Sequence, residues 1–277
     1  MACILYFLRI LTLNPMQTVI LTYGRETVAV AQRVLTELVR RQRSLIFWAI
    51  FPVILLVINS LILEERAQLT RGEAYASAVP PTLVGAALFF SCLGGSIATV
   101  VSEREHRTLK RLFVSPLRGI SYFLGIFLAH LCIGIGQILL VFTLAAFFDA
   151  QFSGSFLLVI LLLGLSIMSY VGVGFVLGTQ LARRTEDANA LVAAFGVPLL
   201  LLGGAFLPTS LFPDSLLAIA AYNPVYHMNE ALLAVLIQGD GVAEIRDHLI
   251  FLLLFSGAVV AGGWFFYQQM LRVERNF

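Results

Sequence analysis

The sequence predicts an all-α membrane protein with six transmembrane helices. Of its 277 residues, 59% are hydrophobic and 12% are charged, and the mean hydropathy is +0.92. Soluble domains are about 45–50% apolar, and a helix needs about 20 apolar residues to cross the hydrocarbon core. Several runs in this chain approach or exceed that length. We therefore expect the chain to cross a membrane several times.

Residues 1–44 are predicted to form a cytoplasmic amino-terminal segment. Residues 1–15 are apolar apart from Arg9, which favours an interfacial anchor or an extension from an upstream start site. From Glu26 to Ser44, apolar and polar residues fall on opposite faces of a helix. The apolar face comprises Ala31, Val34, Leu35, Leu38 and Val39. The arginines between residues 40 and 43 favour an amphipathic helix on an anionic membrane surface. A solvated soluble helix is the alternative.

Residues 45–277 are predicted to form one transmembrane domain of six spans. A polar loop is expected from Glu64 to Pro80, and the fifth span is interrupted by Pro198 and a Gly-Gly pair. Glycines at 172, 174 and 178 on the fourth span favour close helix packing over a hinge. The predicted spans are residues 45–63, 81–101, 121–148, 156–182, 188–206 and 248–270.

Residues 207–247, between the fifth and sixth spans, are the least regular part of the sequence. Their apolar stretches are too short to cross a bilayer and are separated by prolines, as in re-entrant or interfacial helices. The residues that mark this segment are Pro208, Pro213, Asn223 and Pro224.

The distribution of basic residues predicts the orientation of the spans. With the amino terminus inside, fifteen of the 18 Lys and Arg residues lie in inside segments, and only Arg66, Arg71 and Arg246 lie outside. The positive-inside rule then places both termini in the cytoplasm and residues 207–247 outside. The expected location is a bacterial inner (cell) membrane, in contact with its lipids.

Residues 102–117 form a dense block of charge between the second and third spans. A charge at the centre of a bilayer costs about 2.5–3.5 kcal/mol on insertion scales. We therefore expect this block at the cytoplasmic membrane surface.

No catalytic or cofactor-binding motif is present in the sequence. Lys110 is the only lysine and no glycine-rich loop precedes it, so the phosphate loop of ATPases is missing. The four histidines are scattered and the three cysteines are isolated, which excludes the usual metal and disulfide patterns. Glu64-Glu65 would start the motif of membrane-embedded prenyl-protein proteases, but Leu69 replaces its arginine. A net charge of +2 argues against nucleic acid.

His130 and Gln137 are polar residues within the third span. They are seven residues apart and so lie on one face of a helix. The pair favours interhelical hydrogen bonding, and a substrate path or a polar patch between subunits is the alternative.

Two groups of residues carry a resemblance to the permease subunits of type-2 ATP-binding-cassette (ABC) exporters. After the second span, that family has an acidic-basic run with a Gly-Thr-Leu-like element and then a Ser-Pro pair. Here the run has Arg107 in place of the glycine and Lys110 in place of a common glutamate, and Leu233 stands where an arginine is often found. The matching stretches are residues 104–109, Ser115-Pro116, residues 204–208, Phe212-Pro213 and Asn223-Pro224.

The resemblance implies a dimer of two six-span halves, from two copies or from one copy and a homologous permease. It also implies two nucleotide-binding ATPase subunits on the cytoplasmic side, which would hold the ATP and Mg²⁺. Residues 102–117 would be the coupling element that these subunits contact; a solvated loop is the alternative. The contact residues would be Glu103, Arg104, Glu105, His106, Arg107, Thr108, Leu109 and Lys110.

The expected function is therefore ATP-driven export of an amphipathic drug, a lipid or a glycan-type substrate. The apolar spans favour a drug or lipid over a polysaccharide. A channel or ion-driven carrier without ATPase partners is the second hypothesis, although the spans lack the central carboxylates that ion coupling uses. A membrane scaffold is the third.

Overall fold

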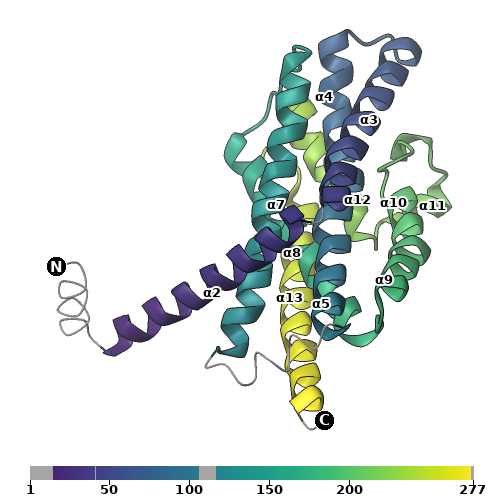
Figure 1. The fold of residues 1–277 in the computed structure, drawn as a ribbon. Helices are drawn as coiled ribbons and strands as arrows, with labels where there is room; N and C mark the ends of the chain where they lie inside the picture. The colour runs from purple at the N-terminus through teal and green to yellow at the C-terminus, as the bar shows by residue number, and fades with distance from the viewer. Residues whose placement is uncertain (1–14, 41, 106–116, 276–277) are drawn as a thin grey trace, which may run out of the picture.

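The structure is a computed structural model that describes residues 15–40, 42–105 and 117–275, and every regular element in these ranges is helical (Figure 1). The helices are α2 (Pro15–Arg40), α3 (Gln42–Arg66), α4 (Arg71–Thr82), η1 (Leu83–Gly94), α5 (Gly95–Glu105), α7 (Gly119–Phe147), α8 (Phe156–Gln180), α9 (Thr185–Leu191), η2 (Val192–Gly196), α10 (Val197–Leu202), η3 (Thr209–Leu211), α11 (Asp214–Ala220), α12 (Pro224–Leu233), η4 (Ala234–Gln238) and α13 (Arg246–Arg275).

Six helical stretches among the described residues are long and apolar enough to cross a membrane, which confirms the predicted fold class. The second combines α4, η1 and α5, and the fifth combines α9, η2 and α10. The six are Gln42–Arg66, Arg71–Glu105, Gly119–Phe147, Phe156–Gln180, Thr185–Leu202 and Arg246–Val273.

The predicted loop from Glu64 to Pro80 is wrong, because a helix begins at Arg71. The Thr70 hydroxyl accepts a hydrogen bond from the Glu73 backbone N–H, and the Glu73 carboxylate accepts one from the Thr70 N–H at 3.0 Å. This capping box satisfies backbone donors that would otherwise be unpaired at the helix start. The helix continues through Pro80 and Pro81 into the π-helix η1, so the second span extends about ten residues further than expected.

The fourth span, α8, lies in the middle of the bundle and packs closely on both sides. A Cβ atom added at Gly172 would lie 2.8 Å from Val259 Cγ2 of α13. One added at Gly178 would lie 3.1 Å from Val100 Cβ of α5. These contacts confirm that the glycines of this span allow neighbouring helices to approach.

The amino-terminal helix α2 extends away from the bundle at its start and packs against α7 nearer its end (Figure 1). Gly125 on α7 makes this possible, since a Cβ atom there would lie 2.6 Å from Val30 Cγ1. Of the predicted apolar face, Val39 is exposed, whereas Val30 joins the buried side. The buried face therefore lies against protein, and the helix is longer than the predicted Glu26 to Ser44.

Residues 207–247 contain four short helices, η3, α11, α12 and η4. α12 is largely buried and contacts α13, α8 and α4. That this segment is re-entrant and lies outside the cell stays a prediction.

Candidate functional site

The charged block begins inside a helix. α5 continues to Glu105, and both Ser102 and Glu103 are buried. These first residues of the block continue the buried face of α5. That the block lies at the cytoplasmic membrane surface stays a prediction. His106, Arg107, Thr108, Leu109 and Lys110 lie outside the described residues.

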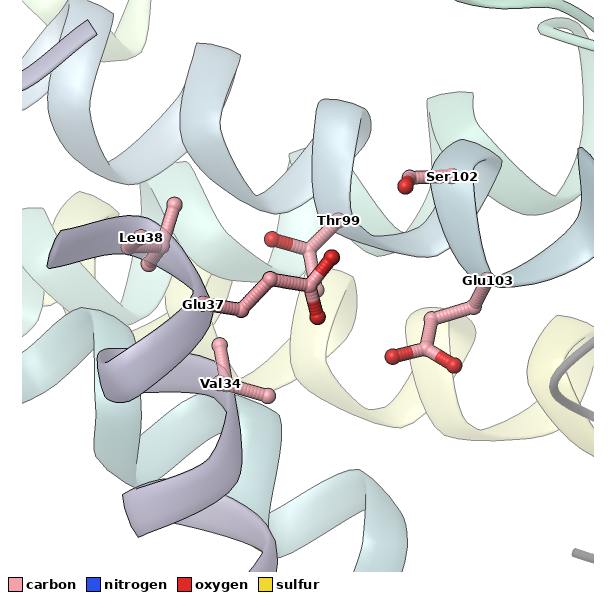
Figure 2. A pocket seen from close by; sticks show the side chains of 6 residues that line it. All are labelled: Val34, Glu37, Leu38, Thr99, Ser102 and Glu103. Carbon is pink, nitrogen blue, oxygen red and sulfur yellow. The ribbon is translucent and has the colours of Figure 1, made fainter. Parts of the chain in front are cut away.

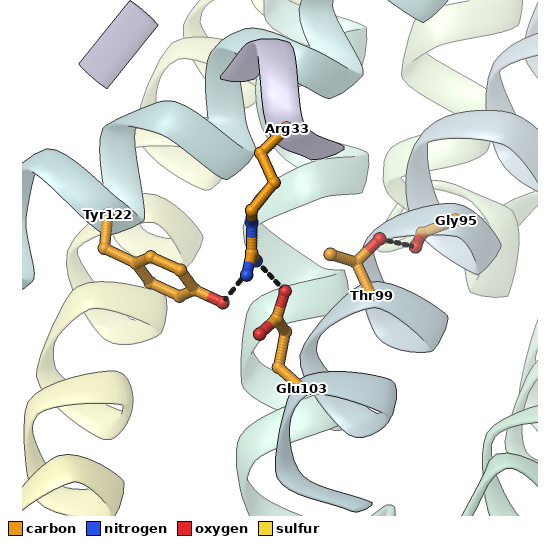
Figure 3. Close-up of polar contacts among 5 residues, drawn as sticks. All are labelled: Arg33, Gly95, Thr99, Glu103 and Tyr122. Atoms are coloured by element: carbon orange, nitrogen blue, oxygen red, sulfur yellow. Dashed lines mark hydrogen bonds and ion pairs between the residues drawn. The ribbon is translucent and has the colours of Figure 1, made fainter. Parts of the chain in front are cut away.

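Glu103 forms an ion pair with Arg33 of α2, 70 residues earlier in the chain (Figure 3). The Glu103 side chain is 6% exposed and the Arg33 side chain 38%. The guanidinium also lies 3.5 Å from the Tyr122 hydroxyl and 5.8 Å from the centre of its ring. Arg33 therefore joins three helices, α2, α5 and α7.

The environment of Arg33 keeps its guanidinium charged. Burial alone would lower the pKa of this group, but the facing carboxylate of Glu103 and the hydroxyl of Tyr122 raise the pKa above its usual value.

A small cavity of about 10 Å³ lies beside this ion pair, between α2 and α5. Figure 2 shows the carboxylates of Glu37 and Glu103 pointing toward each other across it, with Thr99 and Ser102 on its wall. A volume of this size holds about one water molecule, and the two carboxylates offer that water acceptors on both sides.

The two residues after Glu103 contact the carboxyl-terminal end of the fourth span and the start of the fifth. Arg104 donates hydrogen bonds to the backbone oxygens of Thr179 and Ala182, at 3.0 and 3.1 Å. The carboxylate of Glu105 accepts a hydrogen bond from the Thr185 hydroxyl at 2.6 Å. Arg104 thus binds carbonyls that the end of α8 leaves without helical partners.

The residues that follow the undescribed segment 106–116 also contact α2. Arg118, which precedes α7, places its guanidinium 4.2 Å from the centre of the Tyr23 ring. Together with the Arg33–Glu103 pair, this cation–π contact means that α2 binds the chain on both sides of residues 106–116.

A groove of about 500 Å³ lies between the first, second and fifth spans. It lies within the size range of small-molecule sites, about 300–1,000 Å³. Sequence reasoning missed it, because it is formed by residues from helices that are distant in sequence. The lining residues are Arg43, Ser44, Phe47, Trp48, Phe90, Gly94, Ala98, Ala188, Asn189, Val192, Ala193 and Val197.

His130 and Gln137 are both buried on the inner face of α7. His130 Nδ1 lies 2.9 Å from the Ile126 oxygen of its own helix, and the Cys92 thiol donates to the His130 backbone oxygen at 3.6 Å. Neither residue lines the groove. A role in a substrate path or between subunits stays a prediction.

Within residues 207–247, Pro208 and Pro213 precede η3 and α11, and Asn223-Pro224 starts α12. The Asn223 amide donates to the Leu199 oxygen at 2.7 Å, and its oxygen accepts from the Val225 N–H at 3.0 Å. Asn223 thereby caps α12 and ties it to the end of the fifth span.

A pair of histidines fastens α12 to α13. His227 Nδ1 lies 2.8 Å from His248 Nδ1, and His227 Nε2 lies 2.9 Å from the Ala221 oxygen. Because a carbonyl only accepts, the Nε2 of His227 carries hydrogen, and the neutral Nδ1 accepts from His248. Burial lowers the pKa of His227, and His248 lowers it further, although the bond to Ala221 opposes both.

Acid is therefore expected to destabilise the fold through His227. The unfolded chain binds a proton at His227 with a pKa near 6.5. The folded chain binds it only at lower pH, so stability is complete above about pH 6.5 and falls as the pH drops through the folded pKa. One such group contributes at most about 1.4 kcal/mol per pH unit.

The measurement is the unfolding midpoint in detergent between pH 7.5 and 5. A His227→Gln variant keeps a donor for the Ala221 oxygen but cannot titrate, so its midpoint should fall less than that of the unaltered chain. If the unfolding midpoints of the two proteins fall equally as the pH is lowered, His227 is not the group whose protonation destabilises the fold.

Comparison with known families decides which class of membrane protein this is. A family model described as ABC-2 type transporter matches residues 25–237, more than half of the chain. The chain belongs to the ABC-2 type transporter family. Comparison with curated proteins gives no match. The matched range includes most of α2, the charged block, the groove and residues 207–237, which reach into η4. Membership identifies a membrane component of a transporter, and the chemistry of ATP hydrolysis is not part of this family's domain.

Proposed function

We propose that this chain is the membrane-spanning subunit of an ATP-driven exporter that works with separate nucleotide-binding ATPase subunits. It acts in the cytoplasmic membrane as a pair, with a second copy or a homologous permease. ATP and Mg²⁺ bind to the ATPase subunits, since this chain lacks a phosphate loop.

The contacts around residues 106–116 carry this proposal. α2 binds both flanks of the segment, through Glu103 on one side and Arg118 on the other. Arg104 and Glu105 join the same point to α8 and α9. A force applied to residues 106–116 would therefore be transmitted to α2 and to four of the six spans through direct side-chain contacts.

In this mechanism the ATPase subunits push on residues 106–116 when they close on ATP. Glu103, Arg104 and Glu105 hold the base of the coupling element against the bundle. The groups that dock the ATPase are the charged side chains further along, Arg107 and Lys110 among them. Charged contacts of this kind set orientation and partner choice.

The groove between the first, second and fifth spans is the proposed path of the substrate. Its wall is mostly apolar and aromatic, which suits an amphipathic drug or a lipid better than a polysaccharide. A shift of α5 relative to α3 and α9 would change the shape of this groove, and with it the affinity for the substrate.

The decisive experiment uses a double variant, Arg107→Glu with Lys110→Glu. When the variant is purified in mild detergent with its ATPase subunit, we expect the amount of ATPase subunit that co-elutes to be roughly tenfold lower than with the unaltered chain. Substrate-stimulated hydrolysis should be lost in parallel. Arg272→Glu, an exposed charge on the last helix, is the control and should leave assembly unchanged.

Unchanged assembly and hydrolysis in the double variant would refute the coupling role of residues 106–116. If no ATPase co-elutes with the unaltered chain, the exporter assignment is wrong and a channel or carrier takes its place.

A further inference from the structure

The groove has two chemically different parts. Its polar groups come from Arg43 and Ser44 in the first turn of α3 and from Asn189 in α9. Phe47, Trp48 and Phe90 supply an aromatic wall. The rings of Phe47 and Phe90 meet edge to face, with centres 5.6 Å apart. An occupant that fits both parts has a polar head and an apolar body.

Charge narrows the choice of polar head. Arg43 is the one charged residue among the described residues that line the groove, and no carboxylate lines it. From Arg43 the first span continues without another charge until Glu64. A guanidinium binds carboxylate or phosphate oxygens through paired hydrogen bonds, and it repels cations. The groove is thus complementary to an anionic head and an uncharged tail.

The space itself depends on Gly94. A Cβ atom added at Gly94 would meet nothing within 4 Å, so this position faces open space in the groove. The adjacent Gly95 faces the protein interior, where a Cβ atom would lie 3.0 Å from Trp48 Cη2 and 3.1 Å from His130 Nε2. A larger side chain at residue 94 would therefore fill the groove without disturbing the packing behind it.

We propose that this groove binds an amphiphile with an anionic head, drawn from the adjoining membrane leaflet. The carboxylate or phosphate of the head pairs with Arg43, supported by Ser44 and Asn189. The apolar body lies along Phe47, Trp48 and Phe90. The idea that this amphiphile is the exported substrate rests on the proposed function. Its binding in the groove is proposed independently of that function.

Trp48 allows a direct test, because the chain has only two tryptophans. In a Trp264→Phe background, Trp48 alone reports from the groove wall. The protein is placed in phosphatidylcholine nanodiscs, and quenching is recorded with dibromostearate and with its uncharged glycerol ester. We expect dibromostearate to quench at concentrations roughly tenfold lower than the ester, as for a charge-assisted hydrogen bond.

Three variants in that background separate the contribution of the Arg43 charge from that of the open space beside Gly94. Arg43→Gln should bring dibromostearate to the level of the ester, whereas Arg40→Gln, an exposed arginine on α2 that does not line the groove, should change nothing. Gly94→Leu should abolish quenching by both probes while the protein still elutes as a single folded species. Equal quenching by the two probes, or no effect of Arg43→Gln, would overturn the proposal. Quenching by neither probe would also overturn it and would indicate that a second copy covers the groove.

The outcome is independent of the exporter assignment. If binding prefers the anion but dibromostearate does not stimulate ATP hydrolysis in the assembled complex, the site stands and the proposed function fails. If uncharged and anionic amphiphiles stimulate hydrolysis equally, the exporter stands and the selectivity proposed for the groove fails.

Discussion

Replacing Arg33 with methionine is expected to destabilise the protein by about 3 kcal/mol, the lower end of the cost of breaking a buried ion pair. The change leaves the buried carboxylate of Glu103 without its partner. It also leaves Glu37 facing Glu103 across the small cavity, so two like charges remain together (Figure 2).

The reverse change, Glu103→Leu, should cost less, about 1 kcal/mol. Arg33 is partly exposed and can extend into solvent when its partner is removed. The double variant, Arg33→Met with Glu103→Leu, is expected within about 1 kcal/mol of the unaltered chain, because apolar groups replace both charges.

Unfolding in detergent measures all three variants as a double-mutant cycle. Arg40→Met, on the exposed side of the same helix, is the control and should have little effect. Additive losses from the two single variants would show that Arg33 and Glu103 do not interact.

Replacing Gly174 with alanine is expected to destabilise the bundle by about 1–3 kcal/mol, the usual cost of an overpacked core. The new methyl group would overlap Ser96 Oγ and lie 3.0 Å from the Leu93 backbone oxygen. α8 and the second span would have to separate to accommodate it.

Gly164→Ala on the same helix is a matched control with the opposite expected sign. A Cβ atom at Gly164 meets nothing within 4 Å, so alanine should be neutral or should add up to about 1 kcal/mol through its higher helix propensity. Ser96→Ala should recover part of the loss caused by Gly174→Ala, since it removes the overlapping oxygen. Equal effects at residues 164 and 174 would contradict the close packing of α8. Thermal unfolding in detergent distinguishes these outcomes.

Local patterns in the sequence were sufficient for the number of spans and for the close packing around the fourth span. They failed where the decisive contact was short and polar. The Thr70–Glu73 capping box was readable in the sequence, yet the polarity of the surrounding residues favoured a loop there. The helical period placed Val39 on the apolar face of the amino-terminal helix, whereas the face that packs against α7 includes Val30 and leaves Val39 exposed.

The candidate site was likewise predicted only in part from the sequence. The family resemblance implied that the block after the second span contacts another protein, but it offered no means to separate Glu103 and Arg104 from the residues that follow. Glu103 comes three residues after the buried Val100 and so continues the inner face of α5. Its partner, Arg33, lies 70 residues away, and no periodicity within one helix identifies a partner on another.

The sequence by itself determined that this chain crosses a membrane six times, because the length and polarity of each apolar run are set by the thickness of the hydrocarbon core. Its motifs also indicated the transporter family. Only the tertiary structure decided that α2 binds both flanks of residues 106–116, and that Gly94 and its neighbours leave a groove that Arg43 lines. Those features depend on which side chains meet between helices, and that is determined when the helices pack.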